Sequence, residues 1–230
     1  MKELLVSIIM PNYNNEKYLA RSVKSVIDQS YQNWELIVID NRSSDNSLKV
    51  LQGFNDKRIK IFTTDNEGII GKSRNIGLKN SNGEWLSFLD SDDWWEPKKL
   101  EEIFKIINSS DYYDVVVHNE YKIDDKNNQK HILKYGPYEK NFYEKLIIFG
   151  NRISLSAATV RKSFLKYHKI IFSERRDHIT AEDYDLWINI ANNDGKFYWP
   201  EFSYNSIGNF TPGHGYFIKM NSDRDFIFEP

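Results

Sequence analysis

The chain of 230 residues contains no cysteine. This absence excludes disulfide bonds, thiolate metal sites and a cysteine nucleophile, and it fits a reducing compartment such as the cytoplasm. Long apolar runs are missing as well. The stretch 4–10 is too short for the core of a signal peptide, and no later run approaches the roughly 20 apolar residues of a membrane span. We therefore expect a protein that is soluble or at most peripheral to a membrane.

An excess of positive charge is also missing. The 31 Lys and Arg residues are balanced by 33 Asp and Glu, which gives a formal net charge of -2. No global basic field therefore favours nucleic acid as a partner. The phosphate-binding patterns G-x-G-x-x-G and G-x-x-x-x-G-K-[ST] are absent, so neither a dinucleotide fold nor a P-loop is predicted. Repeats and low-complexity linkers are absent too, so residues 1–230 are expected to form one domain.

Short apolar runs of strand length alternate with amphipathic segments in the first half of the chain. Runs typical of buried strands occupy 4–10, 34–39, 59–62, 85–89 and 115–117. Helices are expected between them: one capped by Asn14 or Asn15, one from Ser44 or Asp45 to about Gly53, one over 72–80, and one with Pro97 as its first residue. This alternation predicts an α/β fold with a mostly parallel sheet, followed by a less regular half after about residue 110.

The stretch 85–93 ends abruptly in three acids, Asp90, Asp92 and Asp93. Carboxylates at the carboxyl end of a buried strand lie in the crevice where open α/β sheets bind ligands. Asp90 and Asp92 can present oxygens to Mg²⁺ or Mn²⁺, which usually takes substrate phosphates as further ligands. An acidic surface turn is the alternative. An EF-hand loop starting at Asp90 is rejected, because Trp95 occupies the position where that loop requires glycine.

Three further candidates follow the other strands. Tyr13 could stack on a nucleobase, or it could be a half-buried core residue. The turn 40–45, which begins with Asp40, could offer side-chain acceptors to a base or ribose, or it could form an Asx turn and a helix cap. Arg74 could reach a base or a diphosphate, or it could be a solvated helix residue.

In the second half of the chain, Glu182 and Asp183 are the candidate acid/base residues. If Thr180 caps the following helix, Asp183 stands at the third helical position and completes a capping box, which is the structural alternative. A carboxylate at a helix N-terminus is favoured in its ionised form, as a base requires. His214 lies between glycines, where it could close over a ligand or bind a metal; an ordinary loop histidine is the alternative.

Taken together, these pieces resemble a known family. The ordered set comprises Val6-Ser-Ile-Ile-Met-Pro-Asn-Tyr-Asn-Asn, Glu35-Leu-Ile-Val-Ile-Asp, Arg74-Asn-Ile-Gly, Phe88-Leu-Asp-Ser-Asp-Asp and Ala181-Glu-Asp-Tyr-Asp-Leu-Trp. It is similar to the family 2 inverting glycosyltransferases of the GT-A fold. The resemblance implies one GT-A domain, with a nucleotide-sugar-binding half at 1–110 and an acceptor-binding half at 111–230.

The resemblance also implies roles for individual residues. Pro11, Tyr13, Asn41, Arg74, Asp90, Ser91 and Asp92 would bind the nucleotide. Asp92, with Asp90, would hold a divalent Mn or Mg ion. Asp183 would be the catalytic base and Glu182 its neighbour in the acceptor site, while Asp40, Asp93 and His214 remain secondary candidates.

Two departures from the family pattern affect the expected ligands. Asn41 replaces an aspartate that typically accepts the pyrimidine N3–H, so a UDP-sugar is expected as the donor while thymidine and guanosine donors become less remote. A histidine that the family often carries after a Tyr-Arg pair is absent near Tyr204, which leaves His214 as the candidate substitute. The implied acceptor is a glycan or lipid-linked oligosaccharide of surface polysaccharide synthesis, reached at the inner face of the plasma membrane. A sugar nucleotidyltransferase and a non-catalytic glycan-binding module are the alternatives.

Overall fold

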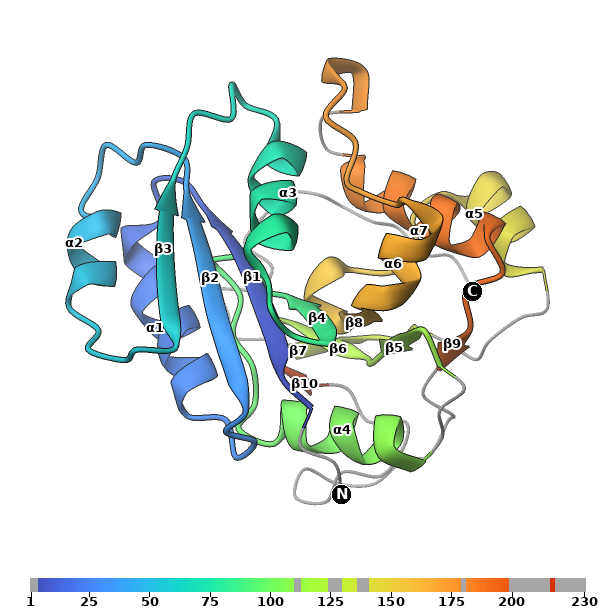
Figure 1. The fold of residues 1–230 in the computed structure, drawn as a ribbon, viewed down its shortest axis with the longest axis horizontal. Helices are drawn as coiled ribbons and strands as arrows, with labels where there is room; N and C mark the ends of the chain where they lie inside the picture. The colour runs from blue at the N-terminus through green and yellow to red at the C-terminus, as the bar shows by residue number, and fades with distance from the viewer. Residues whose placement is uncertain are drawn as a thin grey trace.

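The computed structural model describes residues 4–109, 113–123, 130–135, 141–178, 181–198 and 216–217. Within these residues, one sheet has the strand order β3-β2-β1-β4-β8-β5-β9 and a smaller one has the order β10-β6-β7 (Figure 1). The strands are β1 (Val6–Asn12), β2 (Trp34–Asp40), β3 (Ile59–Thr63), β4 (Trp85–Phe88), β5 (Val115–Val117), β6 (Glu120–Ile123), β7 (Lys130–Leu133), β8 (Ala158–Arg161), β9 (Phe197–Tyr198) and β10 (Tyr216–Phe217).

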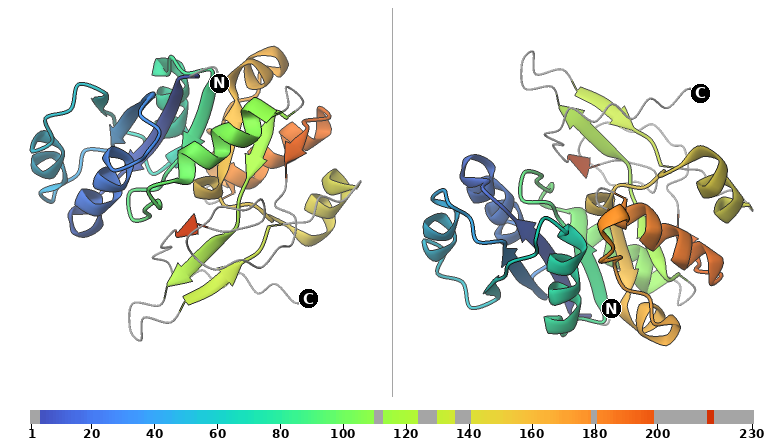
Figure 2. Two further views of the ribbon diagram at one scale, coloured as in Figure 1. Left: turned by 90° about the horizontal axis from the view of Figure 1, so that it is seen from below. Right: turned by 90° about the horizontal axis from the view of Figure 1, so that it is seen from above.

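Helices lie on both sides of the large sheet (Figure 2). They are α1 (Glu16–Ile27), α2 (Ser47–Gln52), α3 (Ile70–Asn80), α4 (Lys99–Ser109), α5 (Phe142–Phe149), α6 (Lys162–His168) and α7 (Glu182–Asn192), with short 3₁₀ helices at η1 (Leu155–Ala157) and η2 (Arg176–His178). Among the described helices, none is both long and apolar enough to cross a membrane.

The large sheet is mostly parallel, which confirms the predicted α/β architecture. Strands β1 to β4 pair in parallel, and only β8 runs antiparallel to its neighbours β4 and β5 among the pairs described. Side chains alternate between two cores, because successive residues of a strand face opposite sides. Ile9 joins the core under α5, α6 and α7, while Ile8 joins the core with α1 and α4. Gly77 lets α3 approach the sheet, since a Cβ there would lie 2.4 Å from Ile9 Cγ2.

Several predicted boundaries shift by a few residues. The first strand continues to Asn12, beyond the predicted residue 10. The short second helix starts at Ser47 rather than at Ser44 or Asp45, and its C-cap is Gly53 as expected. The prediction that Pro97 is the first residue of a helix is wrong, because α4 begins at Lys99. Element ends depend on local hydrogen bonds that apolar periodicity does not specify.

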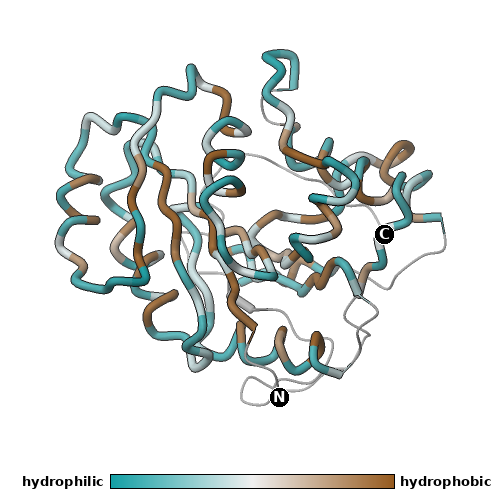
Figure 3. Tube along the Cα trace, viewed as in Figure 1, coloured by the Kyte–Doolittle hydropathy of each residue, from teal (hydrophilic) through white to brown (hydrophobic). Residues whose placement is uncertain are grey.

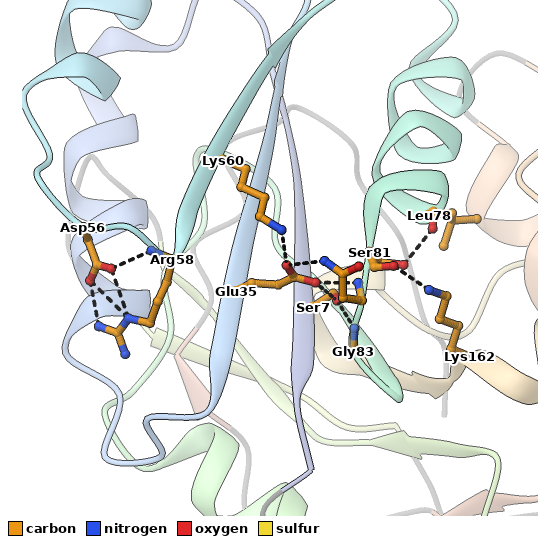
Figure 4. Close-up of polar contacts among 10 residues, drawn as sticks. Ser7, Glu35, Asp56, Arg58, Lys60, Leu78, Ser81, Gly83 and Lys162 are labelled. Carbon is orange, nitrogen blue, oxygen red and sulfur yellow. Dashed lines mark hydrogen bonds and ion pairs between the residues drawn. The ribbon is translucent and has the colours of Figure 1, made fainter.

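At the amino ends of the strands, the buried carboxylate of Glu35 ties three segments together (Figure 4). It accepts hydrogen bonds from Ser7 Oγ at 2.6 Å, from the Asn82 backbone N–H at 2.6 Å, and from Lys60 Nζ at 2.7 Å. Burial alone would raise the pKa of Glu35, but Lys60 and the other donors outweigh it and lower the pKa to about 2. Glu35 therefore stabilises the fold in its ionised form.

We expect Glu35→Gln to lower the free energy of unfolding at pH 7 by about 2–3 kcal/mol, because the donors around Glu35 lose a charged acceptor. The pKa of Glu35 is about 2 when folded and ordinarily 4.5, so its stabilisation is complete above about pH 4.5 and lost towards pH 2. The difference between wild type and variant should shrink over that range in urea titrations. Asp56→Asn, which breaks the partly exposed pair with Arg58, is the control and should cost at most about 1 kcal/mol. An equal loss in both variants would contradict the prediction.

Candidate active site

The carboxyl ends of β1, β2 and β4 open into one cavity of about 440 Å³. It is lined by Pro11, Asn12, Tyr13, Asn41, Asn66, Gly68, Ile70, Ser73, Asp90, Ser91 and Asp92. The structure thus brings six of the predicted nucleotide-binding residues to one place, although they come from three separate strands. Tyr13 is 61% exposed, which rules out the alternative that it is a core residue.

The acidic turn after β4 is held from two sides. On one side, α1 supplies Ser22 Oγ, which donates to the Ser91 carbonyl at 2.7 Å, and the segment before it supplies Asn15 Nδ2, which donates to Ser91 Oγ at 2.9 Å. On the other side, Ser156 Oγ accepts the Asp90 backbone N–H at 3.2 Å. Asn15 is the N-cap residue of α1, as predicted, but its side chain makes no capping bond and serves the turn instead. These contacts fix the backbone from which Asp90 and Asp92 project.

Asp93 is buried behind this turn and is not among the cavity residues. Its carboxyl accepts a hydrogen bond from Ser156 Oγ at 2.8 Å. Burial raises the pKa of Asp93 well above its ordinary value, and the negative charges of Asp92 and Asp90 act in the same direction. Asp93 therefore supports the acidic turn from the protein interior rather than facing the cavity.

The turn after β2 divides into structural and cavity-facing residues. Asp40 is fully buried and accepts hydrogen bonds from Asn12 Nδ2 at 2.7 Å and from the Ser43 backbone N–H at 2.9 Å, so it holds the turn together and does not line the cavity. Asn41 lines the cavity, and its Oδ1 accepts the Asn66 backbone N–H at 2.8 Å. The amide oxygen has a second lone pair for a ligand.

Arg74 is buried, so the alternative of a solvated helix residue is wrong. Its Nη2 donates to Asp90 Oδ1 at 2.9 Å, and its Nη1 donates to Glu182 Oε1. One guanidinium therefore connects the acidic turn of β4 to the first residue of α7. Both terminal nitrogens are engaged by carboxylates, and Arg74 is not among the residues that line the cavity.

Asp183 follows at the second position of α7. The helix begins at Glu182 with Ala181 as its N-cap residue, so the predicted capping box with Asp183 at the third position is wrong; Thr180 lies outside the described residues. Asp183 accepts hydrogen bonds from Asn151 Nδ2 at 2.7 Å and from the Tyr184 backbone N–H at 2.8 Å. Burial raises the pKa of Asp183 most, the charge of Glu182 adds to the rise, and Arg74 partly opposes both, so that the pKa is about 6. A carboxylate of this basicity is suited to accept a proton near neutral pH.

The donor set at the acidic turn suits a divalent cation only in partnership with a phosphate ligand. Among the described residues, no group of three or more His, Cys, Asp or Glu side chains is arranged to hold a metal ion. Asp92 lines the cavity, whereas Asp90 is shared with Arg74. Mg²⁺ and Mn²⁺ are commonly bound by one or two carboxylates together with substrate phosphates. The residues present therefore fit such an ion.

Sequence reasoning missed several residues of this site. Asn66 lies at the cavity and supports Asn41, and its position in a polar loop after β3 was the available signal. Asn151 and Ser156, which contact Asp183 and Asp90, come from segments without any motif. His214 lies outside the described residues, so its predicted role stays a prediction.

This geometry defines an α/β protein with a ligand cavity at the carboxyl edge of its sheet and a paired-acid centre beside it. Residues 7–167 match the family Glycosyl transferase family 2. The chain is also 36% identical over 192 residues to the Escherichia coli UDP-Glc:alpha-D-GlcNAc-diphosphoundecaprenol beta-1,3-glucosyltransferase WfgD, covering 83% of this chain and 71% of that protein. The chain belongs to glycosyltransferase family 2 and is an enzyme of that class.

Solved structures agree on the GT-A fold. S. aureus TarS 1-349 in complex with UDP-GlcNAc superposes with a TM-score of 0.68 at 23% identity, covering 95% of this chain and 59% of that one. The mannosyltransferase PcManGT from Pyrobaculum calidifontis, in complex with GDP-Man and Mn²⁺, gives a TM-score of 0.62 at 17% identity, covering 85% and 54%. This chain therefore spans somewhat more than half the length of these two structures.

Proposed function

We propose that this protein is a metal-dependent, inverting glycosyltransferase that uses a UDP-sugar. The observation that carries the proposal is the buried Arg74, which joins Asp90 at the cavity to Glu182 beside Asp183. The donor diphosphate would lie at the acidic turn, and the uracil ring would lie between Tyr13 and Asn41. A divalent cation held by Asp92 would stabilise negative charge on the leaving nucleotide.

In this mechanism, an acceptor hydroxyl attacks the anomeric carbon of the donor sugar as the bond from that carbon to the diphosphate oxygen breaks. Asp183 takes the hydroxyl proton, and the nucleoside diphosphate leaves with the bonding electrons. Asn151 and the Tyr184 N–H orient the carboxylate. A single displacement inverts the configuration, so an α-linked donor gives a β-linked product.

For the acceptor, we propose a lipid-linked glycan of surface polysaccharide synthesis, used at the cytoplasmic face of the membrane. The support is the relative from Escherichia coli, whose name specifies a UDP-Glc donor, a diphosphoundecaprenol-linked acceptor and a β linkage. A UDP donor also agrees with Asn41, whose free lone pair can accept the uracil N3–H. The family membership disfavours a sugar nucleotidyltransferase, and the presence of both Asp92 and Asp183 disfavours a non-catalytic module.

The metal assignment is tested by Asp92→Ala. We expect at least a tenfold loss of Mn²⁺-dependent UDP-sugar affinity in calorimetry, with an unfolding free energy within about 0.5 kcal/mol of wild type because Asp92 is partly exposed. Asp28→Ala, which removes an exposed acid at the end of α1, is the matched control and should bind normally. Normal affinity in Asp92→Ala, or full UDP release in excess chelator, would refute the assignment.

A further inference from the structure

The outer face of α5 is apolar where a helix of a water-soluble protein is normally polar. Three consecutive side chains are largely exposed: Ile147 at 54%, Ile148 at 69% and Phe149 at 64%. Figure 3 shows this apolar stretch at the outer right side of the molecule, away from β3. Contiguous exposed apolar residues of this kind mark an interaction surface. We call Tyr143, Ile147, Ile148 and Phe149 the α5 patch.

The α5 patch is connected to the proposed catalytic base by contacts between α5 and α7. Its helix is anchored by Leu146, which is buried in the core and whose carbonyl accepts a hydrogen bond from Tyr184 Oη at 2.6 Å. Two residues after Phe149, Asn151 donates its hydrogen bond to Asp183. Two residues span at most about 7 Å, so the patch ends within about that distance of the residue that orients the proposed base.

The chemistry around the α5 patch suits a lipid surface with negative charge. Arg152 lies beside it, with its guanidinium 5.8 Å from the centre of the Phe149 ring. Residues 141–152 carry two cations, Lys145 and Arg152, against one acid, Glu144. Apolar side chains flanked by cations insert at the interface of an anionic bilayer, where burial and charge attraction act together.

A second copy of the chain is a poorer occupant. Four side chains that are each roughly half exposed offer about a few hundred Å² of surface. A stable protein interface covers roughly 800 Å² on each partner. A bilayer interface has no such minimum, because each inserted side chain contributes independently.

We propose that the α5 patch docks this protein on the surface of an anionic lipid bilayer and thereby brings Asp183 to the head group of a membrane-held acceptor. The inference rests on the proposed function for its acceptor, but the surface itself is tested without any sugar. The full chain is incubated with vesicles of phosphatidylglycerol and phosphatidylethanolamine, and the bound fraction is measured by flotation. We expect the double variant Ile147→Ser/Ile148→Ser to partition about tenfold or more weakly than wild type.

The matched control is Ile171→Ser, because Ile171 is an equally exposed isoleucine after α6, which lies apart from α5 in both views of Figure 2. Its partitioning should equal that of wild type. The single variant Ile148→Ser should lose an intermediate part of the vesicle binding, and it remains informative if the double variant fails to fold. Melting curves show whether each variant is folded. Wild-type protein that fails to bind vesicles, or a double variant that binds as wild type does, would overturn the proposal. A dimer of the wild-type protein that is absent in the double variant would also overturn it.

The same proteins separate this inference from the proposed function. UDP release with a short water-soluble glycoside acceptor should be equal in wild type and the double variant, because the patch does not touch the reacting atoms. Vesicle binding without any UDP-sugar turnover would leave the docking surface supported and refute the proposed transfer from a UDP-sugar. Turnover on the soluble acceptor without vesicle binding would do the reverse.

Discussion

Replacement of Asp183 by asparagine should lower turnover by roughly 10² to 10⁴, the usual contribution of a positioned general base. The amide keeps an oxygen for the Tyr184 N–H but offers no site for the acceptor proton. UDP-sugar affinity should stay near normal, since the cavity residues belong to other elements. Calorimetry with UDP and single-turnover transfer kinetics measure the two quantities separately.

The pH profile provides a second test of the same residue. The pKa of Asp183 is about 6, because the carboxyl is buried and Glu182 lies beside it. A base must be ionised, so kcat/KM of wild type should rise with pH to a plateau above about 6. The residual activity of Asp183→Asn should lack this rise. Asp185→Asn, an equivalent change on the same helix, is the control and should keep both the rate and the profile.

Stability should move in the opposite direction to activity. The pKa of Asp183 in the folded protein, about 6, exceeds its ordinary value of 3.8, so folding favours the protonated form. This stabilisation is complete below about pH 3.8 and is lost as pH rises through about 6, which leaves the ionised carboxyl unfavourable at pH 7. Asp183→Asn should therefore be about 0–2 kcal/mol more stable than wild type at pH 7, part of the gain being offset at Asn151. A less stable variant would contradict the raised pKa of Asp183, whereas a variant that transfers sugar normally would assign the base to another residue, Glu182 first.

The part of the site that lines the cavity could be predicted from the sequence, because its residues directly follow recognisable strands. Apolar runs of strand length end at Met10, Ile39 and Leu89, and parallel pairing brings those ends to one edge of the sheet whatever the intervening helices do. The structure places Tyr13 and Asp92 on one cavity for this reason.

The surroundings of Asp183 and Glu182 were harder to predict, because their contacts join segments that are distant in the sequence. Arg74 is 108 residues from Glu182, and no periodic pattern relates the two. The local pattern Thr180-x-x-Asp183 satisfied a capping rule, yet the helix starts at Glu182, where the ion pair with Arg74 holds the first residue. Helix α5 is a further case, because its outer face is exposed although most of its residues are apolar.

Replacement of Arg74 by methionine should cause a large loss of stability. The guanidinium is buried between Asp90 and Glu182, and removing it leaves carboxylates without a compensating charge. Breaking a buried ion pair in this way costs about 3–5 kcal/mol. Arg42→Met is the control: it breaks an exposed pair with Asp65, so its cost should be about 0–1 kcal/mol. Urea unfolding at pH 7 measures both variants.

Two further results would show that the stability loss in Arg74→Met arises from lost charge rather than from lost packing. Arg74 opposes the rise in the pKa of Asp183, so in Arg74→Met that pKa should exceed about 6 and the rise of kcat/KM should move to higher pH. The second variant, Arg74→Met/Glu182→Gln, removes one uncompensated carboxylate together with the guanidinium. It should recover part of the lost stability, since two partners removed together leave no buried charge unpaired at that contact. Additive losses in the double variant would mean that Arg74 acts through its packing against Phe172, whose ring centre lies 5.6 Å from the guanidinium carbon.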